Sequence, residues 1–239
     1  MTDKRVFLAG LATGAVGGLL VGRRLAARPR RMPHLEISQQ VLAETRGPIK
    51  AALLAARVQA CYDELYARRP RFHLPSLRQH LEANILPGLA LYQALREEND
   101  DQESVMAEVD RVFTAWVEHS DQHKLMRIMG RLSDPFAMLR IGNRLVLKMS
   151  YPPEGWTVEW VEDSDRCIAY DIRECFYLNV LTAYGAPELT AHFCRGDDVQ
   201  FGNIPGVAWE RTKTLGRGDD RCNFRFCNLA RPEPGGVSQ

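Results

Sequence analysis

The fold class is decided by residues 156–177, which read WTVEWVEDSDRCIAYDIRECFY. Polar and apolar residues alternate along residues 156–162, which is the period of a strand with one buried face. The triplet Asp163-Ser164-Asp165 is rich in turn-forming residues, and a second run of strand-forming residues, 166–172, follows it. Residues 174–184 then have the pattern of a helix that ends at Gly185. The stretch therefore predicts a β-hairpin followed by a helix.

Downstream of this stretch, the sequence predicts one more helix and two more strands. Pro187 suits the start of a short helix that includes His192 and Cys194. Residues 207–214 and 221–226 have strand patterns and are joined by a polar turn with two glycines. The C-terminal part, residues 151–239, is therefore predicted to have the order β-β-α-α-β-β.

Upstream, helical patterns dominate residues 33–150. Helices are predicted at residues 35–45, 48–69 and 101–119, at Ser76-x-x-Gln79, which resembles a capping box, with an interruption at Pro87-Gly88, and from Ser133-Asp134-Pro135 onward. We predict an α+β fold in which this helical layer packs against a mostly antiparallel sheet, with residues 33–239 forming one domain.

The first 32 residues differ in composition from the rest. Residues 6–22 are an uncharged apolar run of 17 residues, which as a helix extends about 26 Å, the short end of what crosses a bilayer. We predict a single transmembrane helix. A cleaved signal peptide is disfavoured because five arginines follow the run, and a flexible tail is the remaining alternative. Four glycines recur at every fourth position and form a glycine zipper face for self-association or a membrane-protein partner: Gly10, Gly14, Gly18 and Gly22.

Charge is distributed unevenly along the chain. Residues 1–31 carry seven basic side chains and one acid, and because the whole chain has a net charge of +1, the remainder carries −5. An acidic body argues against nucleic acid as a partner. Five arginines after the apolar run against two basic residues before it place the body on the cytoplasmic side of the membrane. Six cysteines without a CxxC pair fit free thiols in a reducing compartment.

Residues that carry reactive groups gather in the C-terminal part. Three cysteines, Cys175, Cys194 and Cys222, are interspersed with His192, Asp197, Asp198 and the predicted strand segment Arg211-Thr212-Lys213-Thr214. Together they offer a nucleophile, a proton carrier and an anion anchor. The alternative interpretation is that the cysteines are packing residues of the core.

Four ordered pieces of this region resemble the L-2-amino-thiazoline-4-carboxylic acid hydrolase family. They are YDIRECFY at 170–177, GAPEL at 185–189, CRGDD at 194–198, and RTKT at 211–214 followed by Gly218-x-x-x-Cys222-x-Phe224. The pieces cover about a quarter of the chain. The resemblance implies a hydrolase that opens a 2-amino-thiazoline ring to N-carbamoyl-cysteine.

The resemblance also suggests roles for individual residues. Cys194 or Cys175 is the candidate nucleophile, and Asp198 is the candidate for activating water or holding the protonated amidine. Arg211 is expected to bind the substrate carboxylate, with Thr212, Thr214 and His192 as further substrate-binding candidates. Residues without an expected role in the reaction are Cys222, which shares a strand face with Phe224 and Phe226, and Cys61, Cys167 and Cys227.

Other functions compete with hydrolysis. His192, Cys194, Cys175, Cys222 and Asp198 are a possible metal ligand set, whereas His119 and His123 lack the glutamate of an HExxH pattern. We expect neither a metal nor a cofactor. A membrane segment has no evident use for a hydrolase of a small soluble acid. The main alternative is therefore a non-catalytic accessory subunit of a membrane complex, and a small-acid sensor is the third hypothesis.

Overall fold

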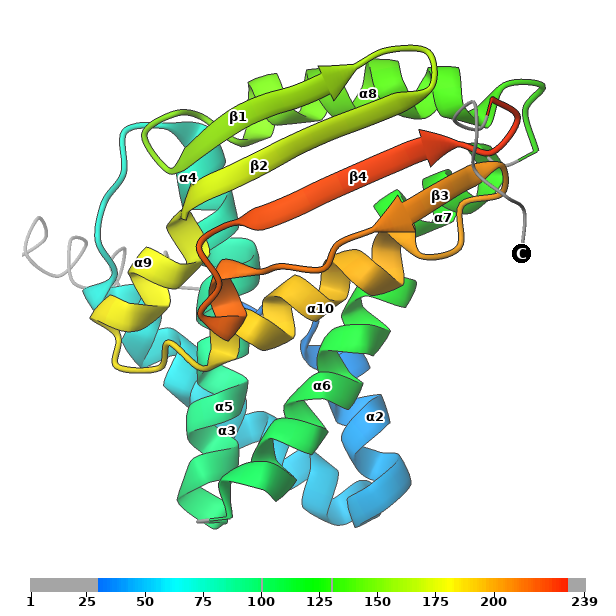
Figure 1. The fold of residues 1–239 in the computed structure, drawn as a ribbon. Coiled ribbons are helices and arrows are strands. Elements are labelled where there is room, and N and C mark those ends of the chain that lie inside the picture. Colours follow the sequence, from blue (N-terminus) through cyan, green and yellow to red (C-terminus); the bar gives the residue numbers. More distant parts are fainter. Residues whose placement is uncertain (1–29, 100, 130, 232–239) are drawn as a thin grey trace, which may run out of the picture. The chain divides into compact units, whose positions relative to one another are not determined.

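The computed structural model describes residues 30–99, 101–129 and 131–231. They contain a helical part followed by a four-stranded sheet, as predicted for an α+β fold (Figure 1). The apolar run at residues 6–22, with its glycine face, lies outside the described residues. Within the described ranges, no helix combines the length and apolarity that crossing a bilayer requires.

Four helices form the layer farthest from the sheet: α2 (Leu35–Arg46), α3 (Pro48–Arg68), α5 (Leu86–Glu98) and α6 (Gln102–Glu118). Gly47 separates the first two, because its φ of 79° ends α2 and Pro48 then starts α3. Helix α6, which was predicted at residues 101–119, buries Val105, Val109 and Val112 on one face. The helices predicted at residues 35–45, 48–69 and 101–119 are therefore confirmed.

The helix before α5 differs from the prediction. It begins at Pro75 as α4 (Pro75–His80), with Leu74 in the capping position and no side-chain cap, so the capping box at Ser76 is wrong. Pro87 does not interrupt the helix either, because a π-helical turn, η1 (Leu81–Ile85), joins α4 to α5. Proline lacks an N–H and crowds the carbonyl four residues earlier, and the wider turn absorbs that clash.

The sheet has the strand order β1 (Trp156–Asp163), β2 (Cys167–Cys175), β4 (Cys222–Asn228) and β3 (Val207–Glu210), with every neighbouring pair antiparallel. Between β2 and β3 lie α9 (Phe176–Ala183) and α10 (Leu189–Phe201), which confirms the predicted order. Helix α10 lies between the sheet and α6, while α7 (Asp121–Met129) and α8 (Pro135–Ser150) precede β1 (Figure 1). A short 3₁₀ turn, η2 (Leu215–Arg217), precedes β4.

The bounds of three elements, β2, α10 and β3, differ from the prediction. Strand β2 runs on to Cys175, because Glu174 and Cys175 still pair with the start of β1, so the helix begins two residues later. Helix α10 is longer than expected and contains both aspartates, 197 and 198. Strand β3 ends at Glu210, so residues 211–214 form an irregular segment instead of a strand.

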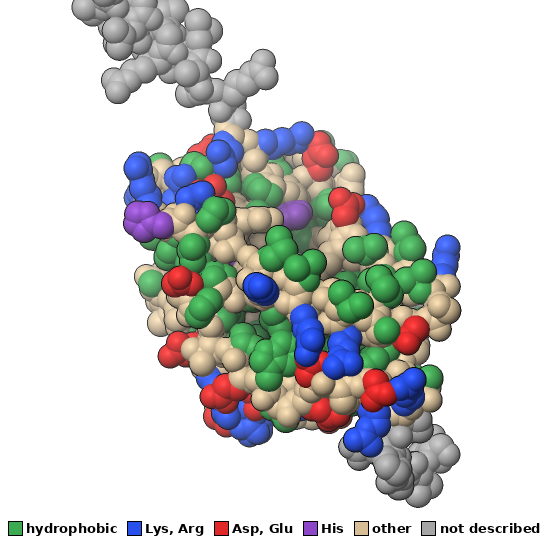
Figure 2. Space-filling view, turned by 90° about the horizontal axis from the view of Figure 1, so that it is seen from above, with side chains coloured by type: hydrophobic (Ala, Val, Ile, Leu, Met, Phe, Trp, Pro, Cys, Tyr) green, Lys and Arg blue, Asp and Glu red, His purple; other side chains and the backbone are tan. Residues whose placement is uncertain are grey.

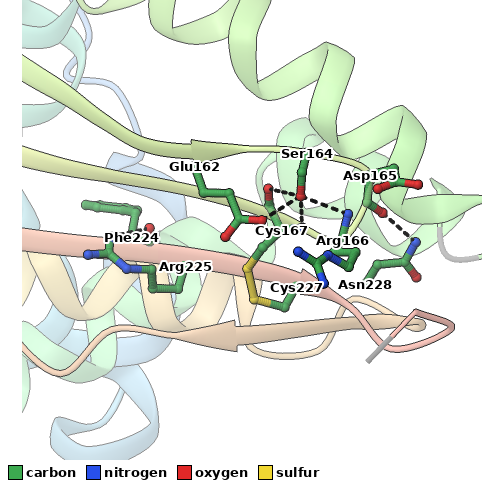
Figure 3. The surroundings of a disulfide bond; sticks show 9 residues. All are labelled: Glu162, Ser164, Asp165, Arg166, Cys167, Phe224, Arg225, Cys227 and Asn228. Carbon is green, nitrogen blue, oxygen red and sulfur yellow. Dashed lines mark hydrogen bonds between the residues drawn. A yellow bond between two sulfur atoms is a disulfide. The ribbon is translucent and has the colours of Figure 1, made fainter. Parts of the chain in front are cut away.

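Cysteine pairing also differs from the prediction. Cys167 and Cys227 face each other across β2 and β4, with Cα atoms 4.2 Å apart, and form a disulfide (Figure 3). The expectation of free thiols is therefore wrong for these two residues, and Cys61, Cys175, Cys194 and Cys222 are free. The Ser164 hydroxyl oxygen accepts hydrogen bonds from the backbone N–H groups of Arg166 and Cys167, which fixes the turn beside the disulfide (Figure 3).

Candidate functional site

A cavity of about 480 Å³ lies between the inner face of the sheet and the helices. Its lining comes from β2, β4, α4, η1, α6, α8, α9 and α10, so segments far apart in the chain meet there. Two parts of the lining differ in chemistry. We call Cys175, Cys194, Asp197 and Cys222 the thiol–carboxylate wall, and His80, Tyr151, Trp156, Tyr177 and Phe193 the aromatic wall.

The thiol–carboxylate wall is assembled from three elements. Cys175 is the last residue of β2, Cys222 is the first residue of β4, and Cys194 and Asp197 lie one turn apart on α10. Cys222 faces inward because alternate residues of β4 are buried, the pattern that the sequence predicted for its face. Three thiols and one carboxylate thus share one cavity.

Cys194 and Cys222 form a hydrogen-bonded thiol pair. The Cys194 thiol interacts with the Cys222 sulfur, which lowers the pKa of Cys222 and, together with burial, raises the pKa of Cys194. The Leu215 backbone N–H also donates to the Cys222 sulfur at 3.2 Å and favours its charged form. Within the pair, Cys222 is therefore the sulfur that becomes a thiolate and Cys194 the donor that stabilises it.

Cys175 behaves differently. Burial raises its pKa to about 11, although backbone hydrogen bonds from Leu178 and Tyr177 at the start of α9 act in the opposite direction. The sequence placed this cysteine early in a helix, where the helix dipole lowers a thiol pKa. The backbone donors are present, but desolvation outweighs them, so Cys175 is a neutral thiol near pH 7.

Asp197 is the carboxylate of the cavity. Burial raises its pKa to about 6, against the opposing effect of Arg211, whose Nη1 lies 2.6 Å from Asp197 Oδ2. The side chain still exposes 36% of its surface although protein surrounds it, because that surface faces the cavity. A carboxyl group that titrates near pH 6 and faces a cavity is suited to general acid–base chemistry.

Four predicted site residues lie outside the cavity lining: Asp198, Arg211, Thr212 and Thr214. Arg211 is 2% exposed, and its fork binds Asp197, the Cys194 carbonyl and Asp198. Asp198 binds Arg211 from the solvent side, where it also accepts from Trp209 Nε1 at 3.1 Å. Thr212 is exposed and accepts from Asn223, and Thr214 is buried beside η2.

His192 does line the cavity, but its Nδ1 lies 2.5 Å from Asp110 on α6. Of the predicted residues, the structure thus brings Cys175, Cys194 and His192 to the cavity and leaves Asp198, Arg211, Thr212 and Thr214 behind its wall.

The aromatic wall is built around His80. Its Nε2 lies 3.0 Å from the Ser150 carbonyl, and its Nδ1 lies 3.0 Å from the Tyr177 hydroxyl. Since a carbonyl can only accept, Nε2 carries the proton and the Tyr177 hydroxyl donates to Nδ1. Burial lowers the pKa of His80, so the ring is neutral. Its ring centroid lies 4.9 Å from that of Trp156 and 5.1 Å from that of Tyr151.

Three polar atoms of the lining have no hydrogen-bond partner among the described residues: Asn143 Oδ1, Thr190 Oγ1 and Gln200 Nε2. Buried polar atoms in folded proteins normally have a partner, and leaving one unpaired costs about 1–3 kcal/mol. Because these three residues also border the cavity, they are the atoms most available for binding a polar ligand.

Metal chemistry finds no geometric support in the described part of the chain. No three or more of its histidine, cysteine, aspartate and glutamate side chains are arranged to hold an ion. His119 Nδ1 instead lies 2.8 Å from the Ala115 carbonyl, within its own helix end.

The sequence analysis did not identify the residues of the aromatic wall. It also assigned the catalytic role to Asp198, whereas Asp197 is the aspartate that lines the cavity. His80, Tyr151 and Tyr177 lie in three separate elements, and no spacing in the sequence connects them. The sequence analysis listed Asp197 among the reactive residues but gave it no role in the reaction. A longer α10 would have been the useful signal, since it puts Asp197 one turn after Cys194.

Comparison with protein families matches residues 78–226 to the L-2-amino-thiazoline-4-carboxylic acid hydrolase family. The chain belongs to this family. The match begins two residues before His80 and includes every residue of both walls, so the hydrolase family shares the region that builds the cavity.

No curated protein matches the chain. Among solved structures, it is similar to the Fe(II) unliganded H-NOX protein from K. algicida, with 13% identity, 86% of this chain and 98% of that chain covered, and a TM-score of 0.32. A point mutant of that protein gives 12% identity, coverages of 85% and 98%, and a TM-score of 0.35. Scores this low carry no argument about fold or function.

Proposed function

We propose that this protein is a hydrolase that opens a small cyclic amidine acid of the 2-amino-thiazoline type. The observation that carries the proposal is the position of Asp197, a carboxyl group with a pKa near 6, beside three thiols in an aromatic cavity. Membership in the hydrolase family supports the same reaction class.

The reaction requires a water molecule to reach C2 of the ring, the carbon between nitrogen and sulfur. Asp197 as a carboxylate accepts one proton from this water while the oxygen bonds to C2 of the protonated ring. The C2–S bond then breaks, and the ring sulfur keeps the electron pair and takes the proton back from Asp197. The amidine becomes a carbamoyl group, and the proton that the ring brought leaves to solvent. One water is consumed and one thiol appears.

The two walls bind different parts of the substrate. A protonated amidine ring is flat and cationic, so it packs on the rings of Trp156 and Tyr151, where the cation–π attraction adds to burial. The Cys222 sulfur, with its lowered pKa, accepts a hydrogen bond from the amidine nitrogen. Cys194 supports that role through its own thiol.

The substrate carboxylate is bound by neutral donors in this proposal. Among the described residues of the cavity lining there is no lysine and no arginine. Gln200 Nε2 and the Thr190 hydroxyl are buried and lack a partner in the described protein, so they are the candidate donors. Arg211 acts indirectly, since its guanidinium holds Asp197 in place and, through Asp198, is fixed from the other side.

The test is the rate of thiol release from 2-amino-thiazoline-4-carboxylate, measured with a thiol reagent and checked by mass spectrometry of the product. Asp197→Asn should lower kcat by about 10²–10⁴-fold, the range for losing a general acid–base group. Asp198→Asn is the matched control, because it binds the same Arg211 from outside the cavity, and should change kcat by less than about ten-fold.

Equal losses in the two variants would reject Asp197 as the base. No turnover by the native chain, together with copurification at fixed ratio with a membrane protein, would favour the accessory-subunit alternative.

The membrane anchor at residues 6–22 and its glycine face remain part of the proposal. The arginines that follow the run favour a body in the cytoplasm, whereas the Cys167–Cys227 disulfide is a bond typical of oxidising compartments. Labelling of Cys61 by a membrane-impermeant thiol reagent, in intact cells and in lysed cells, decides between the two sides.

A further inference from the structure

The outer face of α7 and α8 exposes a stripe of hydrophobic side chains. On α8, the exposed fractions are 45% for Met138, 65% for Ile141, 55% for Leu145 and 66% for Met149. Their spacing of three, four and four residues puts them on one side of the helix. Helix α7, which contacts α8, has no buried residue and exposes Leu125 and Ile128 by 53% and 57%. Apolar stripes of this length on a protein surface usually mark a binding face.

Basic residues border this stripe. Residues 121–150 contain six lysines and arginines and two aspartates, a net charge of +4, although Arg140 and Arg144 both pair with Asp163 of β1. Residues 32–239 as a whole carry −5, so the rest of that body carries −9. Lys124, Arg127, Arg131 and Lys148 are exposed. Figure 2, which views the molecule from the side where β1 and α8 lie in Figure 1, shows hydrophobic side chains gathered with lysines and arginines among them.

We propose that the outer face of α7 and α8 binds the surface of an anionic lipid bilayer. Helices that lie on membranes combine an apolar face with lysine and arginine, which attract anionic headgroups. A second copy of the chain is a poorer occupant, because it would bring two faces of like charge together. An independent feature of the sequence agrees: the uncharged apolar run at residues 6–22 is itself suited to a bilayer.

The same helix forms part of the cavity. Asn143, Leu147 and Ser150 of α8 line it, while Phe136 and Leu139 are the residues of α8 that are fully buried. A bilayer bound to the outer face of α8 would therefore contact the same helix whose inner face lines the cavity. This binding face is distinct from the ring-opening groups and does not depend on them.

The experiment uses the full chain on lipid nanodiscs and places a photoreactive p-benzoylphenylalanine at single positions. Ile141 and Leu145 are the test positions. Ile49 and Leu53 on α3 are the matched controls, because they are equally apolar and 76% and 70% exposed. We expect lipid adducts, identified by mass, at the test positions and about ten-fold fewer at the controls on phosphatidylglycerol discs. On phosphatidylcholine discs, adducts at the test positions should fall by about ten-fold, because the headgroup attraction is lost.

A second variant checks the role of charge while leaving the apolar face intact. Replacing Lys124, Arg127, Arg131 and Lys148 with glutamine should lower lipid adducts at Ile141 several-fold on phosphatidylglycerol discs, with unchanged far-UV circular dichroism as evidence of folding. Protein–protein adducts at Ile141 would overturn the proposal in favour of a second copy. Equal lipid adducts at Ile141 and Ile49, or none at either, would overturn it outright.

Discussion

The two walls of the cavity differ in how their side chains are held. In the thiol–carboxylate wall, groups that can carry charge stabilise one another: Arg211 binds Asp197, and Cys194 donates to Cys222. In the aromatic wall, burial keeps His80 and Tyr177 neutral, and a hydrogen bond joins them. One wall is therefore able to exchange protons near neutral pH, while the other provides shape and a fixed dipole. The assignment of chemistry to one wall and binding to the other follows from this difference.

A pH profile gives the largest expected effect. Asp197 must be ionised to accept a proton from water, and its pKa is raised to about 6, so kcat/KM should rise with pH up to about 6 and then level off. From the plateau down to pH 4 the loss of kcat/KM should be about 100-fold, if one group with a pKa of about 6 controls it. In the Asp197→Asn variant, the residual kcat/KM should no longer rise with pH in this range. A limb that persists unchanged in the variant would assign the titration to another group.

Removing the cation behind the thiol–carboxylate wall should destabilise the fold. Arg211→Met leaves Asp197 and Asp198 without their shared guanidinium. A fully buried pair costs about 3–5 kcal/mol to break, and we expect about 2–3 kcal/mol here because both carboxylates keep some exposure. Urea unfolding at pH 7 measures the change. Arg195→Met, which removes an arginine 62% exposed beside Asp110, is the control and should cost at most about 1 kcal/mol. Similar costs for the two would contradict a structural role for Arg211.

Substitutions in the aromatic wall should have the smallest effect on stability and on kcat. Tyr177→Phe removes the hydroxyl that donates to His80 Nδ1 and keeps the ring, so the unfolding free energy should fall by about 1 kcal/mol. Its effect on kcat should stay well below that of Asp197→Asn, with the larger change in KM. A loss of kcat as large as that of Asp197→Asn would move the proton chemistry to the aromatic wall.

Much of the fold could be predicted because its signals are local. The buried stripe of α6, the break at Gly47 and the alternation of β4 depend on a few neighbouring residues, and each agreed with the structure. The Cys167–Cys227 disulfide could not be predicted in the same way. It depends on the register between β2 and β4, strands separated by about fifty residues, and register is set by tertiary packing.

The sequence could predict which residues gather near the site, but not which of their side chains face the cavity. Relative to Cys194, an α-helix puts Asp197 about 60° to one side and Asp198 about 40° to the other. Either could face a cavity until the rotation of α10 is known, and packing against α6 and the sheet fixes that rotation. His80 carried no signal, because its function depends on a carbonyl at residue 150 and a hydroxyl at residue 177.

The π turn at residues 81–85 has a consequence for length variation in relatives of this chain. Such a turn accommodates one residue more than an α-helix of the same rise, so it fixes the angular phase between α4 and α5. Deleting a single residue from 81–85 would let ordinary helical winding keep that phase, whereas winding all of the present residues as an α-helix would rotate His80 by about 100° with respect to α5. Its imidazole would then point away from Tyr177. The hydrogen bond between His80 and Tyr177, which connects α4 with α9 at the cavity, would be lost.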